Sequence, residues 1–212
     1  MITVLVMMGF AGALNLIYAA FWLAMAIQPI DRATWLLENL LVLVLAPLVL
    51  WTWHKQLISK TSYFLLFLFF VFHTIGSHYT YSKVPWAEWL QHLSGLSVDF
   101  KRNDYDRLVH FLFGLLPFLP ISEWLSKRFK ARPFLIYVLT FLILICGSTF
   151  YELIEWAVAE TFGGGTGADF LGVQGDEFDA QKDQALAIIG AILAWTTLQL
   201  TAYRKSTSAS RP

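Results

Sequence analysis

The sequence predicts an all-α, polytopic membrane protein with six transmembrane helices and both termini in the cytoplasm. Of its 212 residues, 57% are hydrophobic and only 14% are charged, whereas about a quarter of the residues in a soluble domain are charged. Several apolar runs also exceed the roughly 18 residues that indicate a membrane span. The polar segments between these runs are too short for a second domain. We therefore expect one domain over residues 1–205, followed by a mobile polar tail over 206–212.

The hydropathy pattern places the six helices at residues 2–27, 33–53, 62–82, 105–125, 133–158 and 184–203. The first run has no basic start and no convincing cleavage site, so it is predicted to be a retained span and not a signal peptide. The second ends in Trp51 and Trp53, which are typical of a membrane interface. The third is rich in Phe and Leu, and histidines and tyrosines gather at its end.

The later segments carry features that are unusual in an apolar helix. Pro117 and Pro120 lie inside the fourth run and predict a kink, because each removes a backbone donor. The fifth run ends with Glu152 and Glu155, although a carboxylate near the bilayer core costs several kcal/mol unless it is paired, protonated, metal-bound or hydrated. The glycine-rich segment 161–179 precedes the sixth run and predicts a re-entrant or lid-like loop over the outer mouth.

The distribution of basic residues predicts the orientation. Four of them lie within 127–132, and this segment shares one side of the membrane with the turn at 55–60 and with the C-terminal tail. Cytoplasmic segments carry the excess of Lys and Arg, so this side is predicted to be the cytoplasm. The net charge of zero gives no indication of a nucleic-acid partner.

This topology brings the unusual polar residues together at the outer side. Glu152 and Glu155 share a helix face because they are three residues apart, and Asp179 and Asp183 do so because they are four apart. His110 lies one turn into the fourth helix. The other polar residues at this level are Glu38, His73, His78, Asp104, Asp106, Arg107 and Asp176.

Carboxylates from two helices and a histidine from a third are typical of metal centres in helical bundles. The predicted metal ligands are His110, Glu152, Asp179 and Asp183. The predicted catalytic residues are Glu155 or Asp176 as general base and Arg107 for an anionic headgroup. An oxygen-rich ligand set favours a divalent metal such as Mg²⁺ or Mn²⁺, with Zn²⁺ and Ca²⁺ as further candidates.

Structural interpretations of the same residues stay open at this point. Asp104 and Asp106 precede or begin a helix, so both are candidates for N-capping. The structural alternative for Glu152 and Glu155 is an ion pair with Arg107 or a hydrogen-bonded network. Without a metal, clustered acids repel one another, so some of them would stay protonated and form a candidate proton relay.

Three stretches resemble the bacterial inner-membrane family typified by YjdF. They are Asp104–Phe111, Tyr151–Trp156 and Gly172–Asp183. This resemblance covers nearly the whole chain and implies a multi-pass protein of the bacterial plasma membrane, but it implies no catalytic residues. A weaker similarity to VanZ-like membrane proteins implies a role near envelope lipids or glycans, although Ala187 stands where those proteins have Asn.

Three functional hypotheses follow from the sequence. The first is a membrane enzyme, with a metal-assisted site facing outward, that acts on a lipid or lipid-linked envelope substrate. The second is a proton-coupled transporter or permease subunit, since acids within the membrane often form proton relays. The third is a structural or assembly protein in which the acidic cluster only stabilises the fold. The sequence predicts no oligomeric state.

Overall fold

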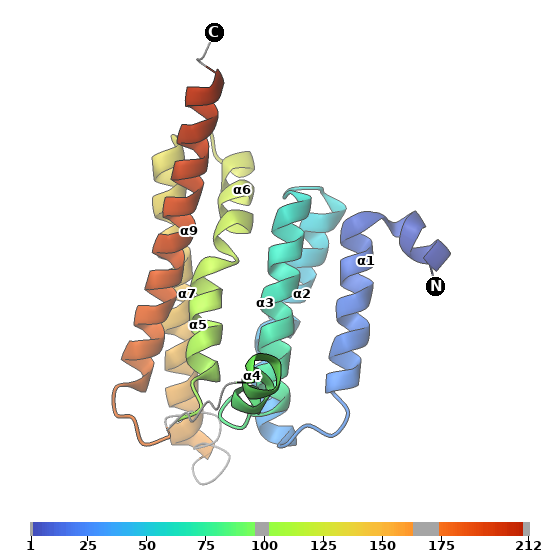
Figure 1. Ribbon diagram of the computed structural model, residues 1–212, viewed down its shortest axis with the longest axis vertical. Coiled ribbons are helices and arrows are strands. Elements are labelled where there is room, and N and C mark those ends of the chain that lie inside the picture. Colours follow the sequence, from blue (N-terminus) through green and yellow to red (C-terminus); the bar gives the residue numbers. More distant parts are fainter. Residues whose placement is uncertain (1, 96–101, 163–173, 210–212) are drawn as a thin grey trace.

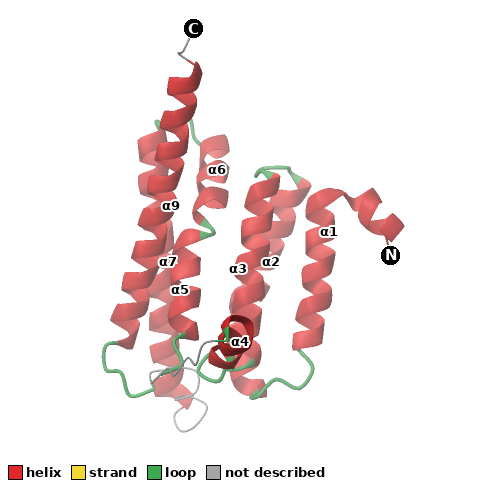
Figure 2. Ribbon diagram, in the orientation of Figure 1, coloured by secondary structure: helices red, strands yellow, loops and turns green. Residues whose placement is uncertain are grey.

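The computed structural model describes residues 2–95, 102–162 and 174–209, and these residues contain helices and no strand (Figure 2). The helices are α1 (Ile2–Met25), α2 (Arg32–His54), α3 (Lys60–His78), α4 (Trp86–Ser94), α5 (Tyr105–Leu115), α6 (Phe118–Arg128), α7 (Pro133–Phe162) and α9 (Asp179–Ala209). The all-α prediction is therefore confirmed. The predicted lid-like loop lies largely in 163–173, outside the described residues.

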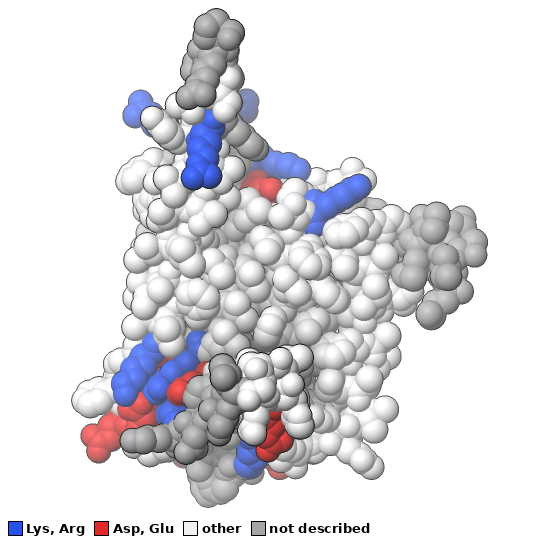
Figure 3. Space-filling model, viewed as in Figure 1, with Lys and Arg blue, Asp and Glu red and all other residues white. Residues whose placement is uncertain are grey.

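The helices form two groups that lie side by side, one of α1, α2 and α3 and the other of α5, α6, α7 and α9 (Figure 1). We call the end at which α3 and α7 finish and α5 and α9 begin the site end, and the opposite end the basic end. The short helix α4 lies at the site end (Figure 1). On the face shown in Figure 3, Lys and Arg dominate the basic end, acidic and basic residues mix at the site end, and the band between them is almost free of charge.

In the described part of the chain, five helical segments are long and apolar enough to cross a membrane, namely α2, α3, the α5–α6 pair, α7 and α9. The first predicted span is broken at Gly9, whose φ of 69° lies in the left-handed region. This break leaves Gly9–Met25 as a shorter apolar helix. The predicted helical architecture is thus confirmed, and the described residues provide five full-length candidate spans and one shorter apolar helix.

The predicted kink in the fourth span occurs at Pro117, between the end of α5 and the start of α6. Pro120 lies in the first turn of α6, where a missing N–H removes no intrahelical hydrogen bond. Other helix boundaries also differ from the prediction. The third helix ends at His78 because Thr80 and Tyr81 adopt positive φ, and α9 begins at Asp179 and continues to Ala209.

The helix pair α5 and α9 packs with its backbones in close approach. A Cβ on Gly114 would collide with the carbonyl oxygen of Ala187, and a Cβ on Gly190 would collide with that of Phe111. Ala187 and Ala191 are fully buried on the facing surface of α9. Small residues of this kind allow membrane helices to pack tightly, and here they fix α5 against the helix that carries Asp183.

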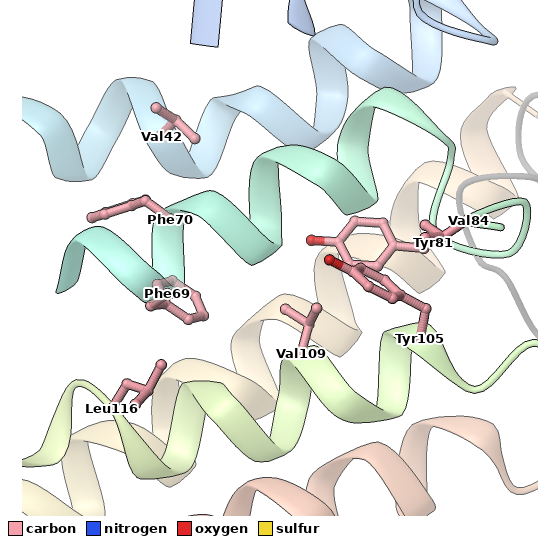
Figure 4. Packing of buried hydrophobic residues seen from close by; sticks show 8 residues of the cluster. All are labelled: Val42, Phe69, Phe70, Tyr81, Val84, Tyr105, Val109 and Leu116. Atoms are coloured by element: carbon pink, nitrogen blue, oxygen red, sulfur yellow. The ribbon is translucent and has the colours of Figure 1, made fainter. Parts of the chain in front are cut away.

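One of the hydrophobic core clusters joins α2, α3 and α5. Its buried members are Val42, Phe69, Phe70, Tyr81, Val84, Tyr105, Val109 and Leu116 (Figure 4). Tyr81 and Tyr105 lie next to each other with their ring centroids 6.2 Å apart, and the Tyr105 hydroxyl donates to the carbonyl of Phe72 at 2.9 Å. This core connects the two helix groups directly beside the polar residues of the site end.

A candidate metal centre at the site end

The first turns of α5 carry the residues around which the site is built. Asp106 and His110 are four residues apart, so they lie on one face of α5, and both are buried. The His110 Nε2 atom lies 3.7 Å from Asp106 Oδ1 and 3.4 Å from Glu152 Oε1. This face of α5 therefore lies against the C-terminal part of α7. The close backbone contact at Gly114 and Gly190 sets the distance between α5 and α9.

Asp106, His110 and Asp183 each offer one ligand atom, and these atoms all lie within 4.8 Å of one another. Asp183 is only 2% exposed, and its Oδ1 atom has no hydrogen-bond partner. The Glu152 Oε1 atom is likewise buried without a hydrogen-bond partner. Buried polar atoms in proteins are almost always hydrogen-bonded, so two unpartnered carboxylate oxygens beside one imidazole indicate a place for a cation.

Glu155 lies within the same cluster but outside this ligand group. It is buried on α7, one turn from Glu152. Its carboxyl interacts electrostatically with those of Asp106, Glu152 and Glu38. Several acids therefore share a space with little water, an arrangement whose repulsion a divalent cation would relieve.

A chain of hydrogen bonds supports the cluster from α2 and α3. The Tyr151 hydroxyl donates to the buried Glu38 carboxylate. The His73 Nε2 atom donates to the backbone carbonyl of Glu38 at 3.2 Å, so Nδ1 is the acceptor for the Tyr81 hydroxyl at 2.5 Å. Tyr151 is thereby fixed beside His110, with the two ring centroids 6.1 Å apart.

A layer of ion pairs covers the cluster toward the surface. Arg107 contacts Asp104 at 2.9 Å, Asp176 at 2.5 Å and Asp179 at 3.3 Å. Asp179 also pairs with Arg102 at 2.5 Å. Hydrogen bonds from Lys182, the Phe178 N–H and Arg107 lower the pKa of Asp176 to about 2. These pairs tie the start of α5 to the start of α9.

The structure brings three of the predicted ligands together, namely His110, Glu152 and Asp183. Asp179, the fourth, is engaged by Arg102 and Arg107. Among the described residues, the ion pairs of Arg107 are with aspartates, so the alternative in which it pairs with Glu152 or Glu155 is not observed. Its predicted role toward an anionic headgroup stays a prediction.

Two participants were not predicted as ligands or as partners of the acids. Asp106 was interpreted as a capping residue, although its spacing of four from His110 was the signal for a shared helix face. Asp104 occupies the N-cap position of α5 but makes no capping hydrogen bond. Arg102 is not among the residues that the sequence predicts at the site, because its pairing with Asp179 depends on how the loops are folded.

The comparisons with known proteins agree with a membrane location. The family model described as "Predicted membrane protein (DUF2238)" matches residues 10–204. The chain is 38% identical over 163 residues to the "Inner membrane protein YjdF" of Escherichia coli (strain K12), and the alignment covers 76% of each protein. No solved structure is significantly similar to the chain. The predicted VanZ-like similarity stays a prediction.

Proposed function

The chain belongs to the DUF2238 family of predicted membrane proteins, as its resemblance to YjdF indicated, and we propose its function from the geometry of the buried site. The protein is a multi-pass integral protein of the inner membrane. We propose that it is an enzyme with a divalent metal in the acidic cluster and a lipid or lipid-linked substrate. The observation that carries the proposal is that Asp183 and Glu152 both lie beside His110, and each has a buried carboxylate oxygen without a hydrogen-bond partner.

The proposed roles follow from the contacts. Asp106, His110 and Asp183 hold the metal, and Glu152 supplies a further oxygen. A divalent metal bound there would polarise a phosphoryl or carbonyl oxygen or activate a water. Glu155 accepts a proton, because it is buried beside the ligand group without belonging to it. Tyr151 and Glu38 position α7 and α2 around the site.

The site also bears on the transporter alternative. A proton-coupled transporter needs a polar route that continues to the other side of the membrane. Among the described residues, the buried acids all lie toward the site end, namely Glu38, Asp106, Glu155, Asp179 and Asp183. The space that extends from them toward the basic end is lined mainly by apolar side chains. This distribution favours chemistry at one level of the membrane.

Metal binding is the first prediction. The protein, purified in detergent and stripped with EDTA, should take up one equivalent of Mn²⁺ or a related divalent ion, measured by elemental analysis after desalting. Binding should raise the thermal unfolding temperature, because a ligand at about 100 times its Kd stabilises the folded state by about 2.7 kcal/mol. Asp183→Asn and His110→Gln should each lose both effects.

The matched control is Glu160→Gln, which removes an exposed carboxylate from α7 and should leave metal uptake unchanged. The unfolding temperature of each variant without metal shows whether the protein is folded. Wild-type protein that binds no metal, and whose unfolding temperature is the same in EDTA and in Mn²⁺, would contradict the proposal and favour a structural network.

A further inference from the structure

A cavity of about 410 Å³ adjoins the acidic cluster between the two helix groups. At the site end its lining residues include Asp106, His110 and Tyr151, together with His73 and Tyr81. These residues include two of the three proposed metal ligands. The cavity is therefore continuous with the proposed reaction site.

The rest of the cavity is apolar and extends toward the basic end. On α2 its lining residues run from Leu41 to Thr52, a rise of about 17 Å at about 1.5 Å per residue. This depth is a little more than half of the roughly 30 Å hydrocarbon thickness of a bilayer. Thr52 and Trp124 lie at the far end, near the ends of α2 and α6.

The cavity borders the surface that faces the membrane. Leu48 of α2 and Ile143 of α7 both line it, and they are 49% and 43% exposed. Residues that line a cavity and are also exposed on an apolar helix surface mark a lateral opening. At the site end this opening is closed by the hydrogen bond from Tyr151 on α7 to Glu38 on α2.

We propose that this cavity holds one hydrocarbon chain of the membrane lipid on which the metal site acts. The chain enters sideways between α2 and α7, and the polar end of the lipid lies against Asp106 and His110. This inference rests on the proposed function, since it names the substrate class and the way in which the substrate is held.

The apolar lining distinguishes a lipid chain from a polar solute. The groups of a polar solute would be desolvated in the apolar part without hydrogen-bond partners. A hydrocarbon chain has no such groups, and it can follow the length of the cavity from the site end to Thr52 and Trp124.

The test uses a phospholipid with a photoreactive diazirine in the middle of one acyl chain, presented to the full-length protein in nanodiscs. Mass spectrometry of the cross-linked peptides should place the label on cavity residues such as Leu45, Val109 and Leu144. Leu45→Trp fills the cavity and should reduce this label at least fivefold. Leu40→Trp is the matched control, because Leu40 lies on the same helix, is 52% exposed and does not line the cavity.

Asp183→Asn separates the two proposals. This variant should lose metal binding and keep the cavity label. The site for the hydrocarbon chain can therefore be tested even if the metal site proves wrong. The inference would be overturned by label that is confined to residues facing the membrane, such as Val44 and Phe150. It would also be overturned by label that is unchanged in Leu45→Trp. Unlabelled phospholipids should compete better as their chains lengthen, until the chain reaches Thr52 and Trp124.

Discussion

At the scale of single residues, the chain separates two kinds of carboxyl group that lie close together in sequence. Asp176 and Asp179 are neutralised by Arg102, Arg107 and Lys182 in the layer of ion pairs. Asp183, one turn further along α9, is buried and keeps an oxygen without a partner. A buried polar atom without a partner costs about 1–3 kcal/mol, and more if it is charged, so the fold retains Asp183 at a cost that a bound cation would remove.

Asp176 gives a prediction about pH. Its pKa is lowered from 3.8 to about 2 by its hydrogen bonds to Lys182, Phe178 and Arg107. A lowered pKa means that its contribution to stability is complete above about pH 4 and disappears as the pH falls toward 2. The unfolding temperature of Asp176→Asn should therefore lie below that of the wild type at pH 6, and the difference should shrink as the pH falls through this window.

Glu177→Gln is the control for this measurement, because Glu177 is an exposed acid next to Asp176 in the sequence. It should follow the wild-type curve between pH 6 and pH 2. A difference between Asp176→Asn and wild type that stays constant over the whole range would show that the ion pairs of Asp176 do not stabilise the fold.

At the scale of helices, the contact between α5 and α9 sets the geometry of the site. His110 and Asp106 lie on one helix and Asp183 on the other, and the two backbones approach at Gly114 and Gly190. Small residues at this contact bring the ligand atoms within the 4.8 Å that the group spans. The helix contact and the metal site are therefore coupled, although Gly190 itself holds no ligand.

Gly190→Ala should show this coupling. Its new Cβ would meet the backbone carbonyl of Phe111, which cannot move without moving α5. Overpacking of this kind costs about 1–3 kcal/mol, and the displaced His110 should weaken Mn²⁺ binding, measured by titration. Gly147→Ala is the matched control, because its Cβ would lie 3.1 Å from the end of the flexible Phe113 side chain. Equal effects of the two substitutions would contradict a special role for the α5–α9 contact.

The sequence predicts the helices better than the details of the site, because hydropathy determines the helices and contacts between single side chains determine the site. Hydropathy identified the spans because long apolar runs have few alternatives in a membrane. It missed the break at Gly9 and the helix end at His78, since both depend on single residues at positive φ. His110, Glu152 and Asp183 were predicted to meet because topology alone brings their helix ends to one level. The ion pairs of Asp176 and Asp179 could not be predicted in this way, because they depend on how side chains from different loops reach one another, and the order of the spans does not determine this.

At the scale of the whole molecule, charge is distributed between the two ends. The basic end contains Lys127 and Arg128 at the close of α6, whereas the site end balances its arginines against aspartates (Figure 3). An excess of Lys and Arg is typical of the cytoplasmic side. This distribution predicts that the acidic cluster faces the periplasm.

This orientation can be tested with two serines in matched environments. Ser94 in α4 lies at the site end and Ser126 in α6 at the basic end. Both are exposed, and each donates to a carbonyl four residues earlier at 2.7 Å. In a Cys146→Ser background, which removes the single native cysteine, each serine is replaced by cysteine. A membrane-impermeant maleimide added to intact cells should label Ser94→Cys, and should label Ser126→Cys only after the inner membrane is opened. The reverse pattern would place the acidic cluster in the cytoplasm and direct the search for a substrate to the inner leaflet.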